Sequence, residues 1–190
     1  NQHSDLRLGE IPLPWIVLSR LFYGKASKIV SVSKDIDSYF SWISKKKKIV
    51  IHNPLVDTES IASDNIEVKI DKNYNHIVAM GRLVRQKGFD LLLKAYAIIA
   101  EQYLDWNLII IGDGKLKSVL MKEIESLNIS NRAYLLGNLK NPFPVLMQSQ
   151  IFVLSSRWEP FGIALIEAMS LGMPVISYNC PGGPSEIIEH

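Results

Sequence analysis

Two glutamates flank a short apolar segment at the start of a predicted helix. Glu159 and Glu167 lie on either side of Pro160–Ile166, and the helix is expected to run from Gly162 to Gly172. Ionised carboxylates accept hydrogen bonds from hydroxyl groups, so the pair suggests recognition of a sugar or a ribose. In the alternative interpretation, Glu159 only favours the helix dipole and Glu167 only faces solvent.

The start of this helix also has the features of an anion site. Phe161, Gly162 and Ile163 contribute backbone N–H groups from the first turn, where these groups have no partner within the helix. Together with the positive end of the helix dipole, they can bind phosphate. Gly162 has no side chain, so a ligand can approach the backbone closely. We therefore expect a phosphate group at this helix start.

A second group of residues, in the stretch GRLVRQKGFD, combines glycine with cations. Gly81 and Arg82 follow an apolar strand predicted at 76–80, and Lys87 and Gly88 precede the next helix. Two cations five residues apart could hold a diphosphate, because arginine supplies a planar fork of donors and lysine a point charge. The alternative is that they are ordinary surface charges.

Alternating strands and helices are expected to position both groups. Short β-branched apolar runs predict buried strands, and apolar residues at helical spacing predict the helices between them. The strands are expected at 76–80, 107–111, 132–136, 151–154 and 174–178, and the helices at 89–103, 115–127, 142–149 and 162–172. This order predicts an α/β fold with a Rossmann-like, doubly wound parallel sheet. Ligands of such sheets bind beyond the carboxyl ends of the strands, where both groups fall.

The first 52 residues show the same alternation less completely. They predict a helix at 14–26, strands at 28–32 and 47–51, and a helix at 34–43 that begins after Ser33 as its N-cap. We interpret 1–52 as the tail of a preceding α/β domain, 53–75 as an interdomain linker and 76–190 as most of a second α/β domain, truncated at its end. The chain starts at Asn1 rather than Met, so we expect a fragment of a longer protein.

The composition excludes several classes of protein. Hydrophobic residues make up 47% of the chain and charged residues 21%, as in an ordinary globular protein. The net charge of +2 is too small to indicate nucleic-acid binding. The single cysteine, Cys180, cannot form an internal disulfide, which favours a reducing compartment. No apolar run is long enough to span a bilayer.

Two further patterns have ordinary structural explanations. Asp35 and Asp37 form a D-x-D pattern that binds metal in other proteins, but they follow Ser33 at a helix start, where acids are favourable in any case. We expect no metal site. The lysines Lys45–Lys48 are typical of the solvated start of a strand, and with Trp42 nearby they leave open a contact with anionic lipid.

A resemblance to a known family extends this interpretation. The segment EPFGIALIE matches the E-x7-E pattern of retaining GT-B glycosyltransferases and resembles family four, the group-one type, in particular. The stretches GRLVRQKGFDLLLKAY, IIGDG, LLGN and MSLGMPVIS…GGPSEII stand in that family's order and at its spacing. The resemblance is strong over 76–190, and 28–54 resembles the end of the family's N-terminal domain and its linker.

The resemblance implies a role for each candidate residue. Arg82 and Lys87 would hold the diphosphate of a nucleotide sugar, Glu159 would contact the transferred sugar, and these three would be the catalytic residues. Glu167 would bind the ribose hydroxyls. The other donor-binding residues would be Gly81, Gly112 and Asp113 along the cleft, Gly137, Asn138 and Leu139 at the base, and Phe161, Gly162 and Ile163 at the distal phosphate.

We therefore expect the donor-binding part of a retaining glycosyltransferase in bacterial capsule or lipopolysaccharide synthesis. It would transfer a hexose or N-acetylhexosamine from a UDP- or GDP-linked sugar, without metal or cofactor, to a glycan or lipid-linked acceptor. The resemblance places the acceptor site mostly in the missing N-terminal domain, so this chain alone is expected to be inactive. The expected location is the cytoplasm, with peripheral contact at the inner face of the plasma membrane.

Two other functions remain open at this point. One is a non-catalytic module that binds nucleotide sugars. The other is a GT-B nucleotide-sugar epimerase, although those enzymes place their acids and histidines differently. A dinucleotide-dependent dehydrogenase is disfavoured, because no G-x-G-x-x-G follows the first strand of the second domain.

Overall fold

The computed structural model describes residues 13–55 and 68–188, which divide into two compact units. The first unit comprises Asn1–Pro54, Trp158–Gly162 and Asn179–His190, and the second comprises Leu55–Arg157 and Ile163–Tyr178. Much of the predicted linker, 56–67, lies outside the described residues, as do 1–12 and 189–190. The domain boundaries drawn from the sequence stay a prediction.

The second unit is a five-stranded parallel sheet with helices on both faces. Its elements are β3 (Asn75–Met80), η3 (Arg85–Lys87), α4 (Phe89–Ala100), β4 (Trp106–Ile111), α5 (Lys117–Ser126), β5 (Ala133–Gly137), α6 (Phe143–Met147), β6 (Ile151–Leu154), α7 (Ile163–Ser170) and β7 (Val175–Ser177). The strand order is β5-β4-β3-β6-β7. The doubly wound parallel α/β fold is confirmed, and each predicted strand and helix of this unit is present within a few residues of its expected bounds.

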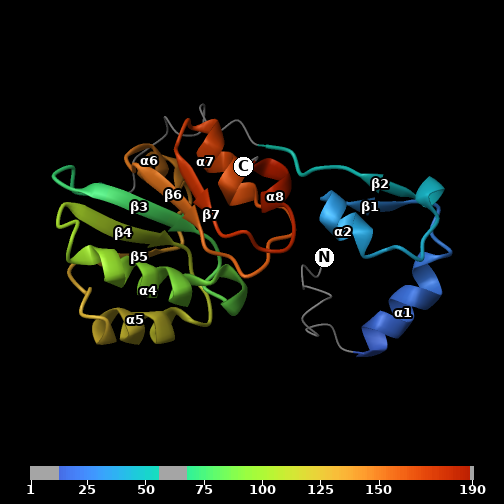
Figure 1. Ribbon diagram of the computed structural model, residues 1–190, viewed down its shortest axis with the longest axis horizontal. Helices are drawn as coiled ribbons and strands as arrows, with labels where there is room; N and C mark the ends of the chain where they lie inside the picture. The colour runs from blue at the N-terminus through green and yellow to red at the C-terminus, as the bar shows by residue number, and fades with distance from the viewer. Residues whose placement is uncertain (1–12, 56–67, 189–190) are drawn as a thin grey trace. The chain divides into compact units, whose positions relative to one another are not determined.

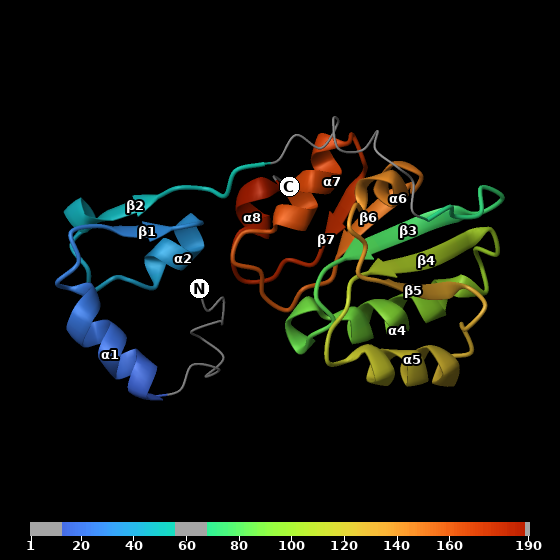
Figure 2. The ribbon, with the colours of Figure 1, turned by 180° about the vertical axis from the view of Figure 1, so that it is seen from behind.

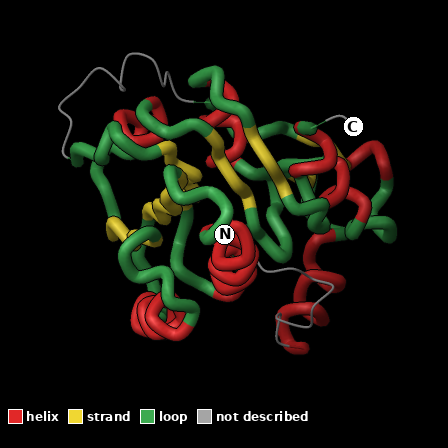
Figure 3. The backbone as a smooth tube through the Cα atoms, turned by 60° about the vertical axis from the view of Figure 1, so that its left-hand side comes forward, coloured by secondary structure: helices red, strands yellow, loops and turns green. Residues whose placement is uncertain are grey.

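The helices cover the two faces of the sheet in pairs. Figures 1 and 2 show α4 and α5 along one face and α6 and α7 along the other, and Figure 3 shows red helices on both sides of the yellow strands. The main core lies under α4 and α5, where Leu93, Tyr96 and Leu120 pack against Leu108 and Ile110. Burial on both faces explains why these strands are continuous apolar runs rather than alternating ones.

The strand order reverses between β3 and β6. The chain runs outward from β3 through β4 to β5, crosses back through α6, and adds β6 on the other side of β3. Ile77 and Val78 of β3 pair with Ile151 and Phe152 of β6. In doubly wound sheets the loops that leave the two strands at this reversal diverge, and the resulting crevice is the usual ligand site.

The described part of the first unit contains a short parallel pair of strands, three α-helices and one 3₁₀ helix. Its elements are α1 (Leu13–Tyr23), β1 (Ile29–Ser31), α2 (Lys34–Ser38), η2 (Lys45–Lys47), β2 (Lys48–Val50) and α8 (Pro184–Ile187). β1 pairs with β2 from Ile29↔Lys48 to Ser31↔Val50. Ser33 is the N-cap of α2, as predicted, and its hydroxyl accepts the Ile36 N–H at 3.2 Å.

One expectation about this unit was wrong, and a second was incomplete. The helix predicted at 34–43 ends at Ser38, because the next N–H groups bond to carbonyls three residues back; the chain turns there and Phe40 packs between Tyr23 and Trp42. The run Lys45–Lys48 leads into β2 as predicted, with Lys45 and Lys46 exposed, but it also has structure of its own. Its first three residues form the 3₁₀ helix η2, and Lys48 forms an ion pair with Asp37 at 2.8 Å.

Among the residues that the structure describes, no helix is both long and apolar enough to cross a bilayer. The contact between the lysine run and lipid that the sequence left open stays untested.

Candidate functional site

The loops that leave β3, β4 and β5 are joined by backbone hydrogen bonds. The Gly81 N–H donates to Ile111 O at 2.9 Å, and the Gly112 N–H donates to Gly137 O at 2.7 Å. Leu83 links the first two loops again, because its N–H donates to Asp113 O at 2.9 Å. The structure thus brings together Gly81, Gly112, Asp113 and Gly137 at the carboxyl edge of the second unit's sheet.

Close backbone contact explains the glycine at position 112. A Cβ on Gly112 would lie 1.9 Å from the carbonyl oxygen of Gly81, and the residue has a φ of +141°. No side chain fits this space, so the chain can hold the β3 and β4 loops at this distance only with glycine.

The two predicted cations follow β3 but differ in how the protein holds them. Arg82 is exposed, and its guanidinium makes no hydrogen bond or ion pair within the described parts of the chain. Lys87 is half-buried at the end of η3, and its Cε lies 3.0 Å from the position of a Cβ on Gly81. The Lys87 side chain therefore lies along the β3 loop, whereas Arg82 presents its charge to solvent.

The β4 loop carries an ion pair that sequence reasoning did not find. The Asp113 carboxylate accepts the Gly114 N–H at 2.7 Å and lies 3.5 Å from Lys117 Nζ. Lys117 Nζ also lies 3.9 Å from the position of a Cβ on Gly137. A cation thus stands beside the predicted base-binding loop, where Asn138 is exposed and Leu139 half-buried. Only the i,i+4 spacing of Asp113 and Lys117 signalled it.

The loop after β6 is fastened to the loop that carries Lys87. The Ser155 hydroxyl donates to Lys87 O at 2.8 Å, and the Arg157 N–H donates to Gln86 O at 2.7 Å. The Arg157 guanidinium donates two hydrogen bonds to the Asp90 carboxylate, at 2.7 and 2.6 Å. These bonds hold the pKa of Asp90 below its usual value, against the opposing effect of partial burial. Sequence reasoning missed this pair, whose members are 67 residues apart.

Glu159, Phe161 and Gly162 belong to the first unit. Glu159 is buried, with 8% of its surface exposed, and it forms an isolated parallel bridge with Gly182. The Phe161 ring stacks on the ring of His52, with centroids 5.0 Å apart. The His52 Nδ1 lies 3.0 Å from Val32 O, so this nitrogen carries a proton and donates. The sequence analysis gave His52 no role, and no pattern in the sequence pointed to the stack.

Ile163 and Glu167 belong to the second unit, on α7. Ile163 is the exposed first residue of the helix, and Glu167 lies one turn later and is half-buried. Burial raises the pKa of the Glu167 carboxyl above its ordinary value. The predicted site residues therefore fall in both units. The hydrogen bonds described above each join residues of the same unit.

The described residues include no group of three or more histidine, cysteine, aspartate or glutamate side chains that could hold a metal ion. Asp37, one acid of the D-x-D pattern, is committed to its ion pair with Lys48.

Comparison with known proteins gives one family. The family described as "Glycosyl transferases group 1" matches residues 61–190. An uncharacterized glycosyltransferase of Methanocaldococcus jannaschii is 38% identical over 185 residues, covering 91% of this chain and 45% of its own length. A Campylobacter jejuni N-acetylgalactosaminyltransferase, named for its diacetylbacillosaminyl-diphospho-undecaprenol-linked substrate, is 33% identical and covers 90% of this chain and 46% of its own.

Solved structures share the fold. The Anabaena protein HepE, crystallised with UDP and glucose, covers 100% of this chain and 54% of its own with a TM-score of 0.82 and 23% identity. Other relatives are named for O-antigen, lipopolysaccharide-core and amylovoran biosynthesis. The chain spans less than half the length of the curated relatives that it matches.

Proposed function

Because the chain belongs to the group 1 glycosyltransferase family, we propose that it forms the donor-binding part of a retaining enzyme that takes its sugar from a nucleotide diphosphate. The main support is the loop cluster at the carboxyl ends of β3, β4 and β5, next to the reversal of strand order between β3 and β6. That is the ligand crevice of doubly wound sheets, and here it carries Arg82 and Lys87.

The diphosphate lies against these two cations. Arg82 has no competing partner among the described residues, so its planar fork is free to bind phosphate oxygens. Lys87, held along Gly81, adds a second positive charge at a fixed place. The N–H groups at the start of α7, with those of Phe161 and Gly162 before it, bind the distal phosphate through the helix dipole.

Carboxylates and loops bind the rest of the donor. Glu159 accepts hydrogen bonds from the transferred sugar, and Glu167 accepts them from the ribose hydroxyls. The base lies against the backbone of Gly137–Leu139, and Gly112 and Asp113 line the cleft between base and phosphates. UDP and GDP are the nucleotides we propose, and UDP is the one crystallised with HepE.

The transfer needs charge stabilisation more than a nucleophile from the protein. The bond from the anomeric carbon to the phosphate oxygen breaks, and its electron pair leaves with the nucleoside diphosphate. The acceptor hydroxyl attacks from the same face, so the configuration is retained, and its proton passes to the released phosphate oxygen. Arg82, Lys87 and the helix N–H groups stabilise the negative charge as it develops. We propose that neither a metal ion nor a cofactor is required.

The acceptor is a glycan or a lipid-linked saccharide of a bacterial capsule or lipopolysaccharide pathway. The Campylobacter jejuni relative, whose name specifies a diphospho-undecaprenol-linked substrate, supports this class. We place the reaction in the cytoplasm at the inner face of the plasma membrane, where nucleotide sugars and lipid-linked acceptors meet. The part of the protein beyond this chain would hold the acceptor.

A donor panel tests the proposal. The natural full-length protein is screened by thermal shift against UDP- and GDP-linked hexoses and N-acetylhexosamines, and the best binder is then offered with lipid-linked saccharides. We expect one donor class to stabilise the protein, an EDTA-resistant transfer, and a product whose anomeric configuration by NMR equals that of the donor. Binding without transfer would indicate a binding module, and conversion of the free nucleotide sugar would indicate an epimerase.

A further inference from the structure

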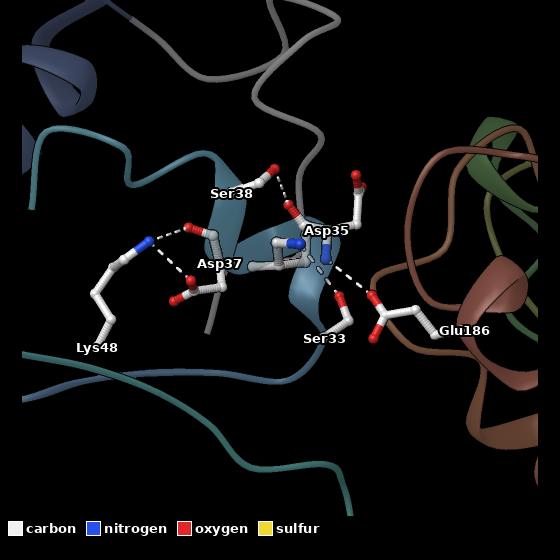
Figure 4. A network of polar contacts seen from close by, with 7 residues as sticks. Ser33, Asp35, Asp37, Ser38, Lys48 and Glu186 are labelled. Atoms are coloured by element: carbon white, nitrogen blue, oxygen red, sulfur yellow. Dashed lines mark hydrogen bonds and ion pairs between the residues drawn. The ribbon is translucent and has the colours of Figure 1, made fainter. Parts of the chain in front are cut away.

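A carboxylate near the end of the chain caps a helix near its beginning. Glu186, in α8, accepts hydrogen bonds from the N–H groups of Lys34 at 3.0 Å and Asp35 at 2.8 Å (Figure 4). These are the first two N–H groups of α2. The third, from Ile36, donates to the Ser33 hydroxyl. All of these residues belong to the first unit. Each Glu186 oxygen thus takes one donor of the helix start.

The segment that carries Glu186 also supports the backbone of Glu159. The Glu159 N–H donates to Pro181 O at 3.0 Å, and the Gly183 N–H donates to Glu159 O at 2.9 Å. The two segments are so close that a Cβ on Gly182 would lie 1.8 Å from Glu159 O, and one on Gly183 would lie 2.1 Å from Phe161 O. The backbone from Glu159 to Phe161 therefore moves with the turn formed by Gly182, Gly183 and Pro184, the GGP turn.

Only one helical turn separates Glu186, which caps α2, from Gly183, which bonds to Glu159. The Glu186 N–H donates to Gly183 O at 2.8 Å, so Glu186 is joined directly to the glycine that holds Glu159. A continuous series of hydrogen bonds leads from the start of α2 through Glu186 and Gly183 to Glu159. Removal of the Glu186 carboxylate would break the two hydrogen bonds that join this series to the start of α2.

We infer that Glu186 is a positioning residue for Glu159. It sets the place of the Glu159 backbone, and through it the carboxylate, without touching the donor. The inference rests on the proposed role of Glu159 at the transferred sugar. A purely local role as a cap of α2 would instead affect stability alone.

The first test separates sugar transfer from nucleoside binding in the natural full-length protein. Because misplacement of a reacting group by about 1 Å can cost about a hundredfold in rate, we expect Glu186→Ala to lower kcat by roughly ten- to hundredfold. Affinity for the free nucleoside should stay within about twofold, since neither Glu159 nor Phe161 is proposed to contact it. Glu186→Gln keeps one acceptor oxygen and should be intermediate. Glu125→Ala, at an exposed glutamate of α5, is the matched control and should change nothing.

A double-variant cycle tests whether Glu186 acts through Glu159. When Glu159 is already Gln, the further change Glu186→Ala should slow transfer by no more than about twofold. When Glu167 is already Gln, Glu186→Ala should slow transfer by the same factor as in the wild type, since the effects of independent sites add in free energy. An unaltered kcat in Glu186→Ala, or multiplying effects with Glu159→Gln, would overturn the inference.

Amide hydrogen exchange tests the physical link without any substrate. We expect Glu186→Ala, and to a smaller degree Glu186→Gln, to speed exchange in peptides covering 158–162 as well as 34–38, with peptides of β4 unchanged. Faster exchange confined to 34–38 would make Glu186 a cap only and refute its positioning role. A wild-type protein that transfers no sugar would refute the proposed function instead, and the exchange data would still decide the link.

Discussion

Arg82 and Lys87 carry the same charge but enter binding at different cost. The Lys87 side chain already lies along Gly81, whereas the exposed Arg82 side chain has to be ordered by the ligand. Ordering a long side chain costs up to about 2 kcal/mol of conformational entropy. In the proposed site the Arg82 guanidinium, which has no partner among the described residues, would compensate with two parallel hydrogen bonds to phosphate.

Substitution of either cation is therefore expected to weaken diphosphate binding. Hydrogen bonds to charged groups contribute about 1.5–3 kcal/mol each, so Arg82→Ala and Lys87→Ala should each reduce affinity for UDP or GDP roughly ten- to hundredfold. Isothermal titration calorimetry measures this loss. Lys122→Ala, at an exposed lysine of α5, serves as the control. Unchanged affinity in both variants would show that the diphosphate binds elsewhere.

With Glu167 in its proposed place at the ribose, its raised pKa predicts a pH dependence of nucleoside binding. The ionised carboxylate is the stronger acceptor for two ribose hydroxyls, so affinity should rise as pH increases through the raised pKa, above the ordinary value of 4.5. Glu167→Gln should bind nucleoside more weakly and lose this dependence, while inorganic diphosphate binding is spared. Titrations of uridine and guanosine against pH check it, and a pH profile that the variant shares with the wild type would contradict it.

Residue patterns alone identified the candidate groups but not their neighbours. Arg82, Lys87 and the E-x7-E glutamates stand out because their types and spacing suit phosphates and hydroxyls. His52 stacks on Phe161 and Glu186 caps α2 only because the chain folds back on itself. Contacts between residues that distant leave no local signal in a single sequence.

At the scale of elements, the Arg157–Asp90 pair connects the end of the β6 loop to the first turn of α4. Both side chains are partly buried, 23% and 33% exposed, and the pair is bidentate. With this geometry, the pair should stabilise the fold more than an exposed surface ion pair and less than a fully buried one. The pair holds two loops of the second unit in register.

Loss of this pair should destabilise the second unit. We expect Arg157→Ala to lower the free energy of unfolding by about 1–2 kcal/mol, measured by urea denaturation at neutral pH. Because the folded pKa of Asp90 lies below the unfolded value near 3.8, its contribution is complete above that value and disappears as pH falls through the folded pKa. Asp90→Asn should reduce this loss of stability at acidic pH, the acid limb of the stability profile. Glu125→Gln, the control, should leave the limb unchanged.

The secondary structure was predictable because each strand of the second unit is a short apolar run between turn residues. His76–Met80 and Ile151–Leu154 needed only their composition. Their pairing as β3 and β6 depends on the crossover through α6, which only topological rules suggest. The early end of α2 at Ser38 could not be read from the sequence, because the packing of Phe40 with Tyr23 and Trp42 overrides helical continuation.

At the scale of the whole molecule, the first unit exposes much apolar surface. Trp15, Leu21 and Phe22 of α1 are 56%, 60% and 57% exposed. A two-stranded sheet is not stable on its own in water, and parallel strands normally have both faces covered. The relatives are about twice as long as the chain, which agrees with a first unit that other parts of the protein complete.

The isolated chain is therefore expected to bind its donor weakly and to transfer nothing. Under the proposed function the diphosphate would still reach Arg82 and Lys87, but the acceptor site would lie outside these residues, so no hydroxyl would be held near the sugar. A radiolabelled-donor assay on the chain alone, beside the natural full-length protein at equal concentration, checks this. Transfer by the chain alone would mean that the acceptor site lies within these residues.

The position of β3 in the sheet has a consequence for synthesis on the ribosome. β3 gains β4 as a neighbour soon after it emerges, but its other partner, Ile151–Phe152 of β6, is made much later. Until then the middle of the future sheet has an open edge with unpaired N–H and C=O groups, which can template association with other chains. A nascent chain paused before β6 should thus need chaperone protection more than one released at full length.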